Sequence, residues 1–357
     1  MTFQISAKDE AKRLRLRRRL VLLILSAVVV MSSALAVGIG ALGLSFVDCV
    51  SYVLAPPGFS APWVADEFER NVIWTLRMPR VVLGLCVGAV LAVSGAVMQG
   101  LFRNPLAEPG LLGVSSGAAL AAATVIVLGG DFIASLPTPY GQLVLPLAAF
   151  FGGAVCTYLV YGVSLSNGRL SISTMLLAGI AFNAIGFSFL GFLQYIADDG
   201  ELRSLTFWML GSLGDPTWSE LSVVIPLLAI TLVGSYWLAR PLNCFLLGEV
   251  EAMHLGIPIQ RVNRIAICLV ALGVGVCVSM TGMIGFIGLV TPHLLRLAVS
   301  PDHRIVIPGA ALLGAALLVS ADAVARTVVA PAELPVGILT TLIGAPFFLF
   351  LLIKARR

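Results

Sequence analysis

The chain has 357 residues, of which 59% are hydrophobic and only 11% charged, and its mean hydropathy is +1.02. Soluble domains carry about 25% charged residues, so a water-soluble core could not hide this much apolar surface. The net charge of +4 lies mainly in short loops, where it reports membrane orientation and not binding to nucleic acid. The composition predicts an all-α protein that crosses the lipid bilayer several times.

The sequence lacks the usual signatures of catalysis and metal binding. The six cysteines form no CxxC pair, the three histidines form no HExxH motif, and no nucleophile–base pair or carboxylate dyad stands out. The cysteines indicate small apolar packing residues, and neither a metal site nor a catalytic residue is predicted. No GxxxxGK[ST] motif occurs, so ATP is not expected to bind this chain through a P-loop.

The first 19 residues are strongly basic and precede a long apolar run. Seven of these residues are Lys or Arg, and the apolar run extends from Leu20 to about Phe46. Because the apolar region of a signal peptide has only about 7–15 residues, the run predicts an uncleaved first span that enters from the cytoplasm. Residues 1–19 are therefore expected to be cytoplasmic.

Apolar segments alternate with polar loops along the rest of the chain, which predicts a membrane domain over residues 20–353. Spans are predicted at about 81–102, 111–129, 143–164, 172–196, 219–239, 305–324 and 337–353. External segments are expected at 47–79, 130–142 and 197–218, the last with a short amphipathic helix over 205–213. Residues 240–264 form the longest polar stretch expected inside, and residues 354–357 form a cytoplasmic tail.

The apolar segment from Ile265 to Leu297 is too long for one crossing. Its 33 residues would make a helix of about 50 Å, whereas the hydrocarbon core is about 30 Å thick. The stretch from Met280 to Gly285, and then Thr291-Pro292, can interrupt it, which favours two short spans. The predicted fold is therefore an all-α polytopic membrane protein with ten transmembrane helices and both termini in the cytoplasm.

The distribution of charge supports this orientation. Of the 22 Lys and Arg residues, 17 fall in segments expected inside, whereas 12 of the 18 acidic residues fall outside. The five basic residues expected outside are Arg70, Arg77, Arg80, Arg203 and Arg326. This asymmetry follows the positive-inside rule, and an odd number of spans would destroy it.

A weak echo in the sequence predicts two related halves. Ser94-Gly95 followed by Asn104-Pro105 resembles Thr281-Gly282 followed by Thr291-Pro292, at an offset of 187 residues. Halves of five spans each would be inverted relative to one another, as in many transporters. A chance match between glycine-rich apolar helices is the alternative.

Carboxylates are nearly absent from the predicted spans, which bears on the source of energy. Asp322, near the outer end of the ninth span, is the nearest exception. Proton-coupled carriers usually place Asp, Glu or His within spans, so a proton-coupled secondary carrier is disfavoured. Uphill transport would then depend on a separate energy-supplying subunit.

Three arginines near the expected outer surface are candidate docking residues. Arg77, Arg80 and Arg326 stand on a mainly acidic face, where they can grip the carboxylates of a soluble delivery protein. Anchoring to lipid headgroups is the alternative.

The internal stretch from Leu247 to Pro258 is a candidate contact for a partner. It is polar and carries a short helix-forming run that ends at a glycine and a proline. A short helix beneath the bilayer would fit a groove on a partner protein, and an ordinary solvated loop is the alternative.

The fifth span carries two amides on one face. Asn183 and Gln194 are three turns apart, and Phe187 and Leu190 lie near the same face, which is typical of a pathway lining. An interhelical hydrogen-bonded face is the alternative. The inner end of this span carries three hydroxyl residues, Ser171, Ser173 and Thr174. They are interpreted either as a gate or as ordinary hydroxyls at the start of a helix.

Seven ordered motifs give the chain a strong resemblance to a known family. They are RMPR, GAVLAVSGAVMQGLFRNPLAEPGLLGVSSGA, LGEVEAMHLGI, GMIGFIGLVTPHLLR, SPDHR, ADAVAR and AELPVGILTTLIGAPFFLFLL, between about residue 77 and the C-terminus. Together they resemble the permeases of ABC importers for cobalamin, iron-siderophores and haem. The overall pattern is most similar to permeases for haem uptake in Gram-negative bacteria.

The resemblance implies a homodimer in the inner membrane, with the pathway at the two-fold interface and the fifth span lining it. It implies two ATP-binding cassette subunits on the cytoplasmic side, docked against the segment that contains Gly248, Glu249, Ala252, Leu255 and Gly256. A periplasmic binding protein would dock on Arg77, Arg80 and Arg326. No cofactor would be bound permanently: ATP would act on the partner subunit, and haem, or else a ferric siderophore or cobalamin, would be the cargo.

Overall fold

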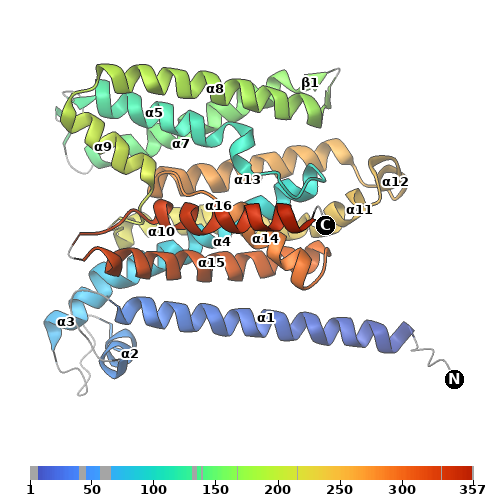
Figure 1. Cartoon of the computed structure of the whole chain (residues 1–357), viewed down its shortest axis with the longest axis horizontal. Helices are drawn as coiled ribbons and strands as arrows, with labels where there is room; N and C mark the ends of the chain where they lie inside the picture. Colours follow the sequence, from blue (N-terminus) through green and yellow to red (C-terminus); the bar gives the residue numbers. More distant parts are fainter. Residues whose placement is uncertain are drawn as a thin grey trace.

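The computed structural model describes residues 7–39, 46–56, 66–130, 135–137, 140–166, 168–214, 216–330 and 332–355. These residues form a bundle of helices that run mostly side by side (Figure 1). The N-terminal part contains α1 (Ala7–Gly38), α2 (Phe46–Leu54), α3 (Glu67–Val72), a π-helical turn η1 (Ile73–Arg77) and α4 (Met78–Leu101).

The first span is shorter at its outer end than the sequence predicted. The apolar run was expected to stay in one span to about Phe46, but α1 ends at Gly38 and Phe46 begins the separate helix α2. Glycine favours the end of a helix because its backbone is the least restricted. The expected external segment 47–79 is helical at both of its described ends, since α2 extends to Leu54 and α3 and η1 continue into α4.

The middle of the chain follows the predicted spans closely. A 3₁₀ turn η2 (Pro109–Leu112) precedes α5 (Val114–Leu128), and α7 (Tyr140–Val163) leads to a hairpin of β1 (Leu165–Ser166) and β2 (Arg169–Leu170), where Leu165 pairs with Leu170. Next come α8 (Ile172–Ile196), α9 (Asp199–Leu210) and α10 (Trp218–Trp237). Capping boxes at Asp198 and Thr217 satisfy the first backbone donors of α9 and α10.

The C-terminal part consists of α11 (Ala239–Phe245), α12 (Glu249–His254), α13 (Ile259–Thr281), α14 (Ile287–Ala298), α15 (His303–Val328) and α16 (Val336–Ala355). The predicted interruption of the 265–297 segment is confirmed, because α13 ends at Thr281 and α14 begins at Ile287. Gly282 stops α13 with φ +67°, and a β-carbon there would lie 2.0 Å from the carbonyl oxygen of Trp208. Only glycine suits this position.

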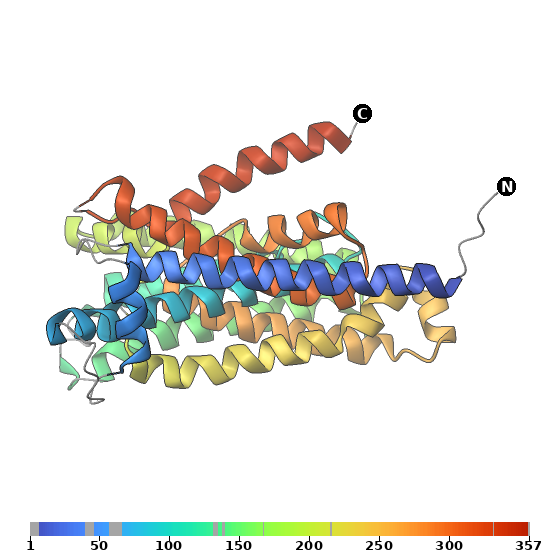
Figure 2. The same cartoon turned by 90° about the horizontal axis from the view of Figure 1, so that it is seen from below.

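Seven of the described helices are long and apolar enough to cross a bilayer, and three shorter apolar helices accompany them: α5, α14 and the first 15 residues of α16. The start of α1 and the end of α16 lie toward the end of the bundle that carries α12 (Figure 1). In Figure 2, α16 leans away from the other helices toward its C-terminus.

Helix α4 lies at the centre of the bundle and contacts α10, α13, α14 and α15. Small residues allow this close approach. A β-carbon at Gly95 would lie 1.7 Å from the carbonyl oxygen of Gly288 on α14. Van der Waals contact between backbones, which small residues permit, is a main source of helix association in membranes.

The sequence echo does not correspond to equivalent structures. Ser94-Gly95 lies inside α4 and Asn104-Pro105 follows that helix, whereas Thr281 ends α13 and Thr291-Pro292 lies inside α14. The two stretches therefore occupy different positions in their helices, and the inverted repeat stays a prediction.

Candidate functional site

At one end of the bundle, the structure joins two of the predicted docking arginines in a cluster of four charges, here named the Asp322 cluster: Arg80, Asp322, Arg326 and Glu333. Arg80 contacts Asp322 at 2.9 Å and Glu333 at 2.8 Å, and Arg326 contacts Asp322 at 3.1 Å. Asp322 is 2% exposed at its side chain, whereas Glu333 is 52% exposed. The cluster has two charges of each sign, so each buried guanidinium faces a carboxylate.

Arg77, the third predicted docking residue, lies beside the C-terminal end of α1. Its Nη1 donates to the carbonyl oxygens of Val37 and Gly38 at 2.6 and 3.1 Å. Arg326 donates to the carbonyl oxygens of Ala36 and Ile39 in the same way. A cation is favourable there because the last carbonyls of a helix carry partial negative charge.

The sequence predicted that Arg77, Arg80 and Arg326 share one end of the molecule, and the described contacts bring them together. Their side chains are turned toward the chain's own acceptors, with Arg77 and Arg80 only 6% exposed. Their docking role stays a prediction. The sequence did not reveal that Asp322 and Glu333 would be their partners.

Tyr52 on α2 adds a further contact at this end. Its hydroxyl donates to Glu69 Oε2 at 2.9 Å, and the side chain is buried. Burial and then the hydrogen bond to Glu69 raise the pKa of Tyr52 to about 12, because both disfavour the phenolate.

At the opposite end, the predicted short helix of the internal stretch is present as α12. Gly248 precedes it with φ +118°, and Gly256 follows it with φ +79°, so glycine suits both positions. Ala252 is fully buried against the bundle, and Glu249 contacts Arg103 at 3.0 Å. The other side of this segment is apolar and exposed, at 50–65%: Leu246, Leu247, Val250, Met253 and Leu255.

A chain of part-buried polar contacts anchors the neighbouring helix α11 to the bundle. Asn243 Oδ1 accepts from the backbone nitrogen of His303 at 2.8 Å and lies 2.9 Å from Nδ1 of the same residue, while Asn243 Nδ2 donates to Asp302 at 2.6 Å. The His303 proton therefore belongs on Nδ1, and its Nε2 is free to accept from Arg296 Nη2 at 3.4 Å.

The same chain of contacts continues into the central helix. Arg296 also donates to Gln99 Oε1, and Gln99 Nε2 donates to the carbonyl oxygen of Leu289 at 3.1 Å. These polar groups thus link α4, α11, α14 and α15 at the end of the bundle that carries α12. SPDHR and Gln99 both lie in motifs that the sequence shares with the family it resembles, but the sequence did not show that they meet.

The predicted pathway residues of α8 are divided between two surroundings. Asn183 accepts from Ser116 Oγ at 2.5 Å and donates to the carbonyl oxygen of Gly110 at 3.1 Å. Gln194 contacts Met209 Sδ at 3.6 Å, and Leu190 is 3% exposed. Phe187, by contrast, is 45% exposed. The contacts of Asn183 and Gln194 fit the interhelical alternative, and the pathway role of the four residues stays a prediction.

The predicted gate residues lie at the start of α8. Ser171 is the N-cap: its Oγ accepts from the Thr174 backbone nitrogen at 3.3 Å and from Thr174 Oγ1 at 2.8 Å. Ser173 is exposed. The helix-start interpretation accounts for these contacts, and the gate role stays a prediction.

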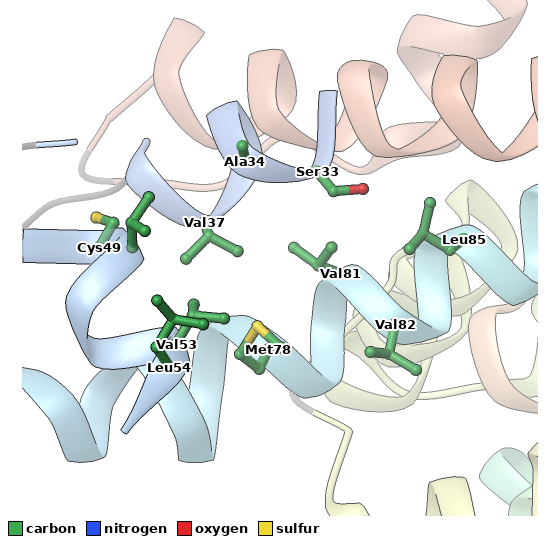
Figure 3. A pocket seen from close by; sticks show the side chains of 11 residues that line it. Ser33, Ala34, Val37, Cys49, Val53, Leu54, Met78, Val81, Val82 and Leu85 are labelled. Carbon is green, nitrogen blue, oxygen red and sulfur yellow. The ribbon is translucent and has the colours of Figure 1, made fainter. Parts of the chain in front are cut away.

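Two apolar cavities lie between neighbouring helices of the bundle. One of about 290 Å³ lies between α1, α2 and α4, and Figure 3 shows its almost wholly apolar lining, including Val37, Val53 and Val81. Another of about 280 Å³ lies between α7 and α13. Among the described residues, no group of three His, Cys, Asp or Glu side chains is placed to hold a metal ion.

Comparison with known proteins gives a consistent result. A sequence model of the FecCD transport family matches residues 17–354. The hemin transport system permease protein HmuU of Yersinia pestis is 47% identical over 80% of this chain and 84% of its own length. The vitamin B12 import system permease protein BtuC of Escherichia coli is 42% identical over 83% of this chain and 87% of its own.

A solved structure supports the same relationship. It is an inward-facing conformation of a metal-chelate type ABC transporter, with a TM-score of 0.79 and 32% sequence identity. The match covers 93% of this chain and 98% of the solved one.

Proposed function

This chain belongs to the FecCD transport family and is a permease of an ABC importer, and we propose that its cargo is haem. The observation that carries this proposal is the 47% identity to the hemin permease, compared with 42% to the vitamin B12 permease. Because these values are close, cobalamin is the second candidate, and a ferric siderophore is the third. ATP would be hydrolysed by a separate subunit.

Ten crossings and a homodimer follow as the proposed architecture. The seven long apolar helices and the three shorter ones together give ten candidate crossings. An even number is supported by the start of α1 and the end of α16, which lie toward the same end of the bundle. The exposed aromatic residues of α8, including Phe187, Phe189 and Phe192, offer an apolar surface to a second copy or to the pathway between copies.

The end that carries α12 is proposed to be cytoplasmic, in the inner membrane of a bacterium. Basic residues from distant parts of the sequence gather in its segments, among them Arg103, Arg240 and Arg304, while Asp66 and Asp198 lie toward the other end. The positive-inside rule then places both termini in the cytoplasm.

Helix α12 is the proposed contact for the ATPase subunit. Its buried Ala252 holds it to the bundle, while Val250, Met253 and Leu255 leave an exposed apolar surface for a partner. The part-buried contacts between Asn243 of the neighbouring helix α11 and His303 of α15 would connect this segment to the transmembrane helices. A movement of α12 would therefore reach α4 and α15 without being absorbed by a flexible loop.

Docking of a periplasmic binding protein is proposed at the Asp322 cluster and Arg77. Glu333 is half exposed and occupies one edge of the Arg80 guanidinium. A carboxylate of the binding protein would take the place of Glu333, because both compete for the same donor.

The cargo is tested by uptake into proteoliposomes that contain this permease, its ATPase subunit and its binding protein. Hemin, cobalamin and a ferric siderophore are supplied separately, with ATP enclosed. Haem uptake that depends on ATP, with no uptake of the other two, is the expected result. Uptake of cobalamin or the siderophore alone would transfer the assignment to that cargo.

The contact with the ATPase is tested in the same vesicles with Val250→Ser/Met253→Ser. We expect cargo uptake per ATP to fall at least tenfold, because the partner loses its apolar contact. Leu165→Ser is the matched control, since Leu165 is also an exposed apolar residue at this end but lies in the β-hairpin. Uptake equal to that of the control would reject α12 as the contact.

A further inference from the structure

The cavity between α7 and α13 differs from the one in Figure 3 because it joins an apolar trough to a basic end. Its trough is lined by Phe150, Ala154 and Tyr158 of α7 and by Cys268, Ala271 and Leu272 of α13. The cavity between α1, α2 and α4 has no charged residue in its lining. Of these two cavities, only the α7–α13 groove therefore offers an amphipathic ligand both an apolar surface for its hydrocarbon part and a cation for its charged part.

The basic end of the groove is formed by Arg264. This residue is exposed, and its Nε donates to the Tyr161 hydroxyl oxygen at 3.3 Å. Among the described residues, no carboxylate lies within ion-pair distance of Arg264. Its remaining guanidinium donors and the Tyr161 hydroxyl proton can therefore both be directed to an anion.

Two further cations lie toward this end of α13. Arg261 is exposed one turn before Arg264, and Arg169 is exposed on the β-hairpin. The hairpin is fixed to the start of α13, because the Leu170 backbone nitrogen donates to Gln260 Oε1 at 2.9 Å. The open end of the groove thus has a positive potential that a monovalent or divalent anion would neutralise.

The flanks of the groove are suited to hydrocarbon. On α7, Phe151, Val155 and Tyr158 are 57–74% exposed and continue the apolar surface outward from the trough. Thr157, a polar residue of the lining, already donates to the carbonyl oxygen of Gly153 at 2.9 Å and offers no unpaired donor. An acyl chain would therefore find apolar contacts along the groove and no unsatisfied polar group.

We propose that the α7–α13 groove binds an anionic phospholipid, with its phosphate on Arg264 and Tyr161 and an acyl chain in the trough. Basic pockets between transmembrane helices near the cytoplasmic surface are suited to anionic lipid headgroups. The assignment to the cytoplasmic leaflet rests on the orientation given under Proposed function; the site itself does not. The apolar trough of about 280 Å³ favours a lipid over a free phosphate ion.

The binding of lipid is tested by native mass spectrometry of the purified full-length protein in detergent. The protein is titrated with phosphatidylglycerol and, separately, with phosphatidylethanolamine of the same acyl chains. Arg264→Gln should weaken phosphatidylglycerol binding about fivefold, since one basic residue near an anionic lipid contributes about a factor of five. Phosphatidylethanolamine should bind weakly to both proteins.

Arg304→Gln is the matched control, because Arg304 is an exposed arginine at the same end of the bundle but lies on α15, outside the groove. It should leave phosphatidylglycerol binding unchanged. Equal binding of the two lipids by the unaltered protein, or equal losses in Arg264→Gln and Arg304→Gln, would overturn the proposal.

The trough is tested independently of the charge. Ala271→Phe fills the groove while leaving Arg264 in place, so it should weaken long-chain phosphatidylglycerol at least fivefold. Full binding by this variant, or competition by millimolar inorganic phosphate, would assign the site to a free anion and reject the lipid. These titrations need neither cargo nor ATPase, so an error in the proposed cargo would leave their outcome unaffected.

Discussion

The Asp322 cluster allows a sharp prediction, because Arg80 contacts two carboxylates that differ mainly in burial. Asp322 is 2% exposed and contacts both Arg80 and Arg326, whereas Glu333 is 52% exposed and, among the described residues, has an ion pair only with Arg80. Asp322→Asn removes one buried charge and keeps the shape of the side chain. Glu333→Gln makes the same chemical change at the half-exposed position.

The magnitudes follow from distance and burial. At 2.9–3.1 Å and an effective dielectric constant of about 20, each contact of Asp322 is worth about 5 kcal/mol of Coulomb energy before desolvation. Because desolvation offsets much of this, removal of one partner from a buried ion pair costs about 3–5 kcal/mol. A partly exposed pair contributes about 0–1 kcal/mol, which is the loss expected for Glu333→Gln.

The measurement is thermal unfolding of the purified protein in detergent, followed by tryptophan fluorescence. Asp322→Asn should lower the unfolding midpoint markedly, and Glu333→Gln should lower it little. Adding Arg326→Gln to Asp322→Asn should restore part of the loss, because a cation that has lost its carboxylate is then removed. Equal midpoints for the two single variants would refute the argument from burial.

Two further predictions concern packing and pH. Gly95→Ala should lower the free energy of unfolding by about 1–3 kcal/mol or more, since its β-carbon would meet the Gly288 carbonyl oxygen. The control is Gly191→Ala, where no atom of another described element lies within 4 Å of the added carbon; similar midpoints for the two variants would contradict the close α4–α14 contact. The second prediction follows from the pKa of Tyr52, which is raised from an ordinary value of about 10 to about 12 in the folded protein. The contribution of Tyr52 to stability should be complete below pH 10 and lost as the pH rises from 10 to 12, because only the unfolded chain then releases the proton readily. Tyr52→Phe should remove this part of the alkaline loss, and identical pH profiles for the variant and the unaltered protein between pH 8 and 12 would contradict it.

The sequence was sufficient to predict most helices because the bilayer limits their length. A span needs about 20 apolar residues, so the 33-residue segment from Ile265 to Leu297 had to be divided. Gly282 lies at the division because its positive φ is disfavoured for other residues. The same reasoning failed at α1, where the apolar pattern continues past Gly38 and hydropathy alone does not distinguish one helix from two.

The sequence by itself determined that this chain is a helical membrane protein of a known importer family, since composition, charge asymmetry and ordered motifs are properties of the chain alone. Only the tertiary structure decided where the polar side chains point. Arg80 and Asp322 are 242 residues apart, and Asn183 and Ser116 are 67 apart, so neither contact follows from local spacing. Burial next to a partner turned Arg80 and Arg326 inward, because a guanidinium removed from water needs a carboxylate or carbonyls nearby.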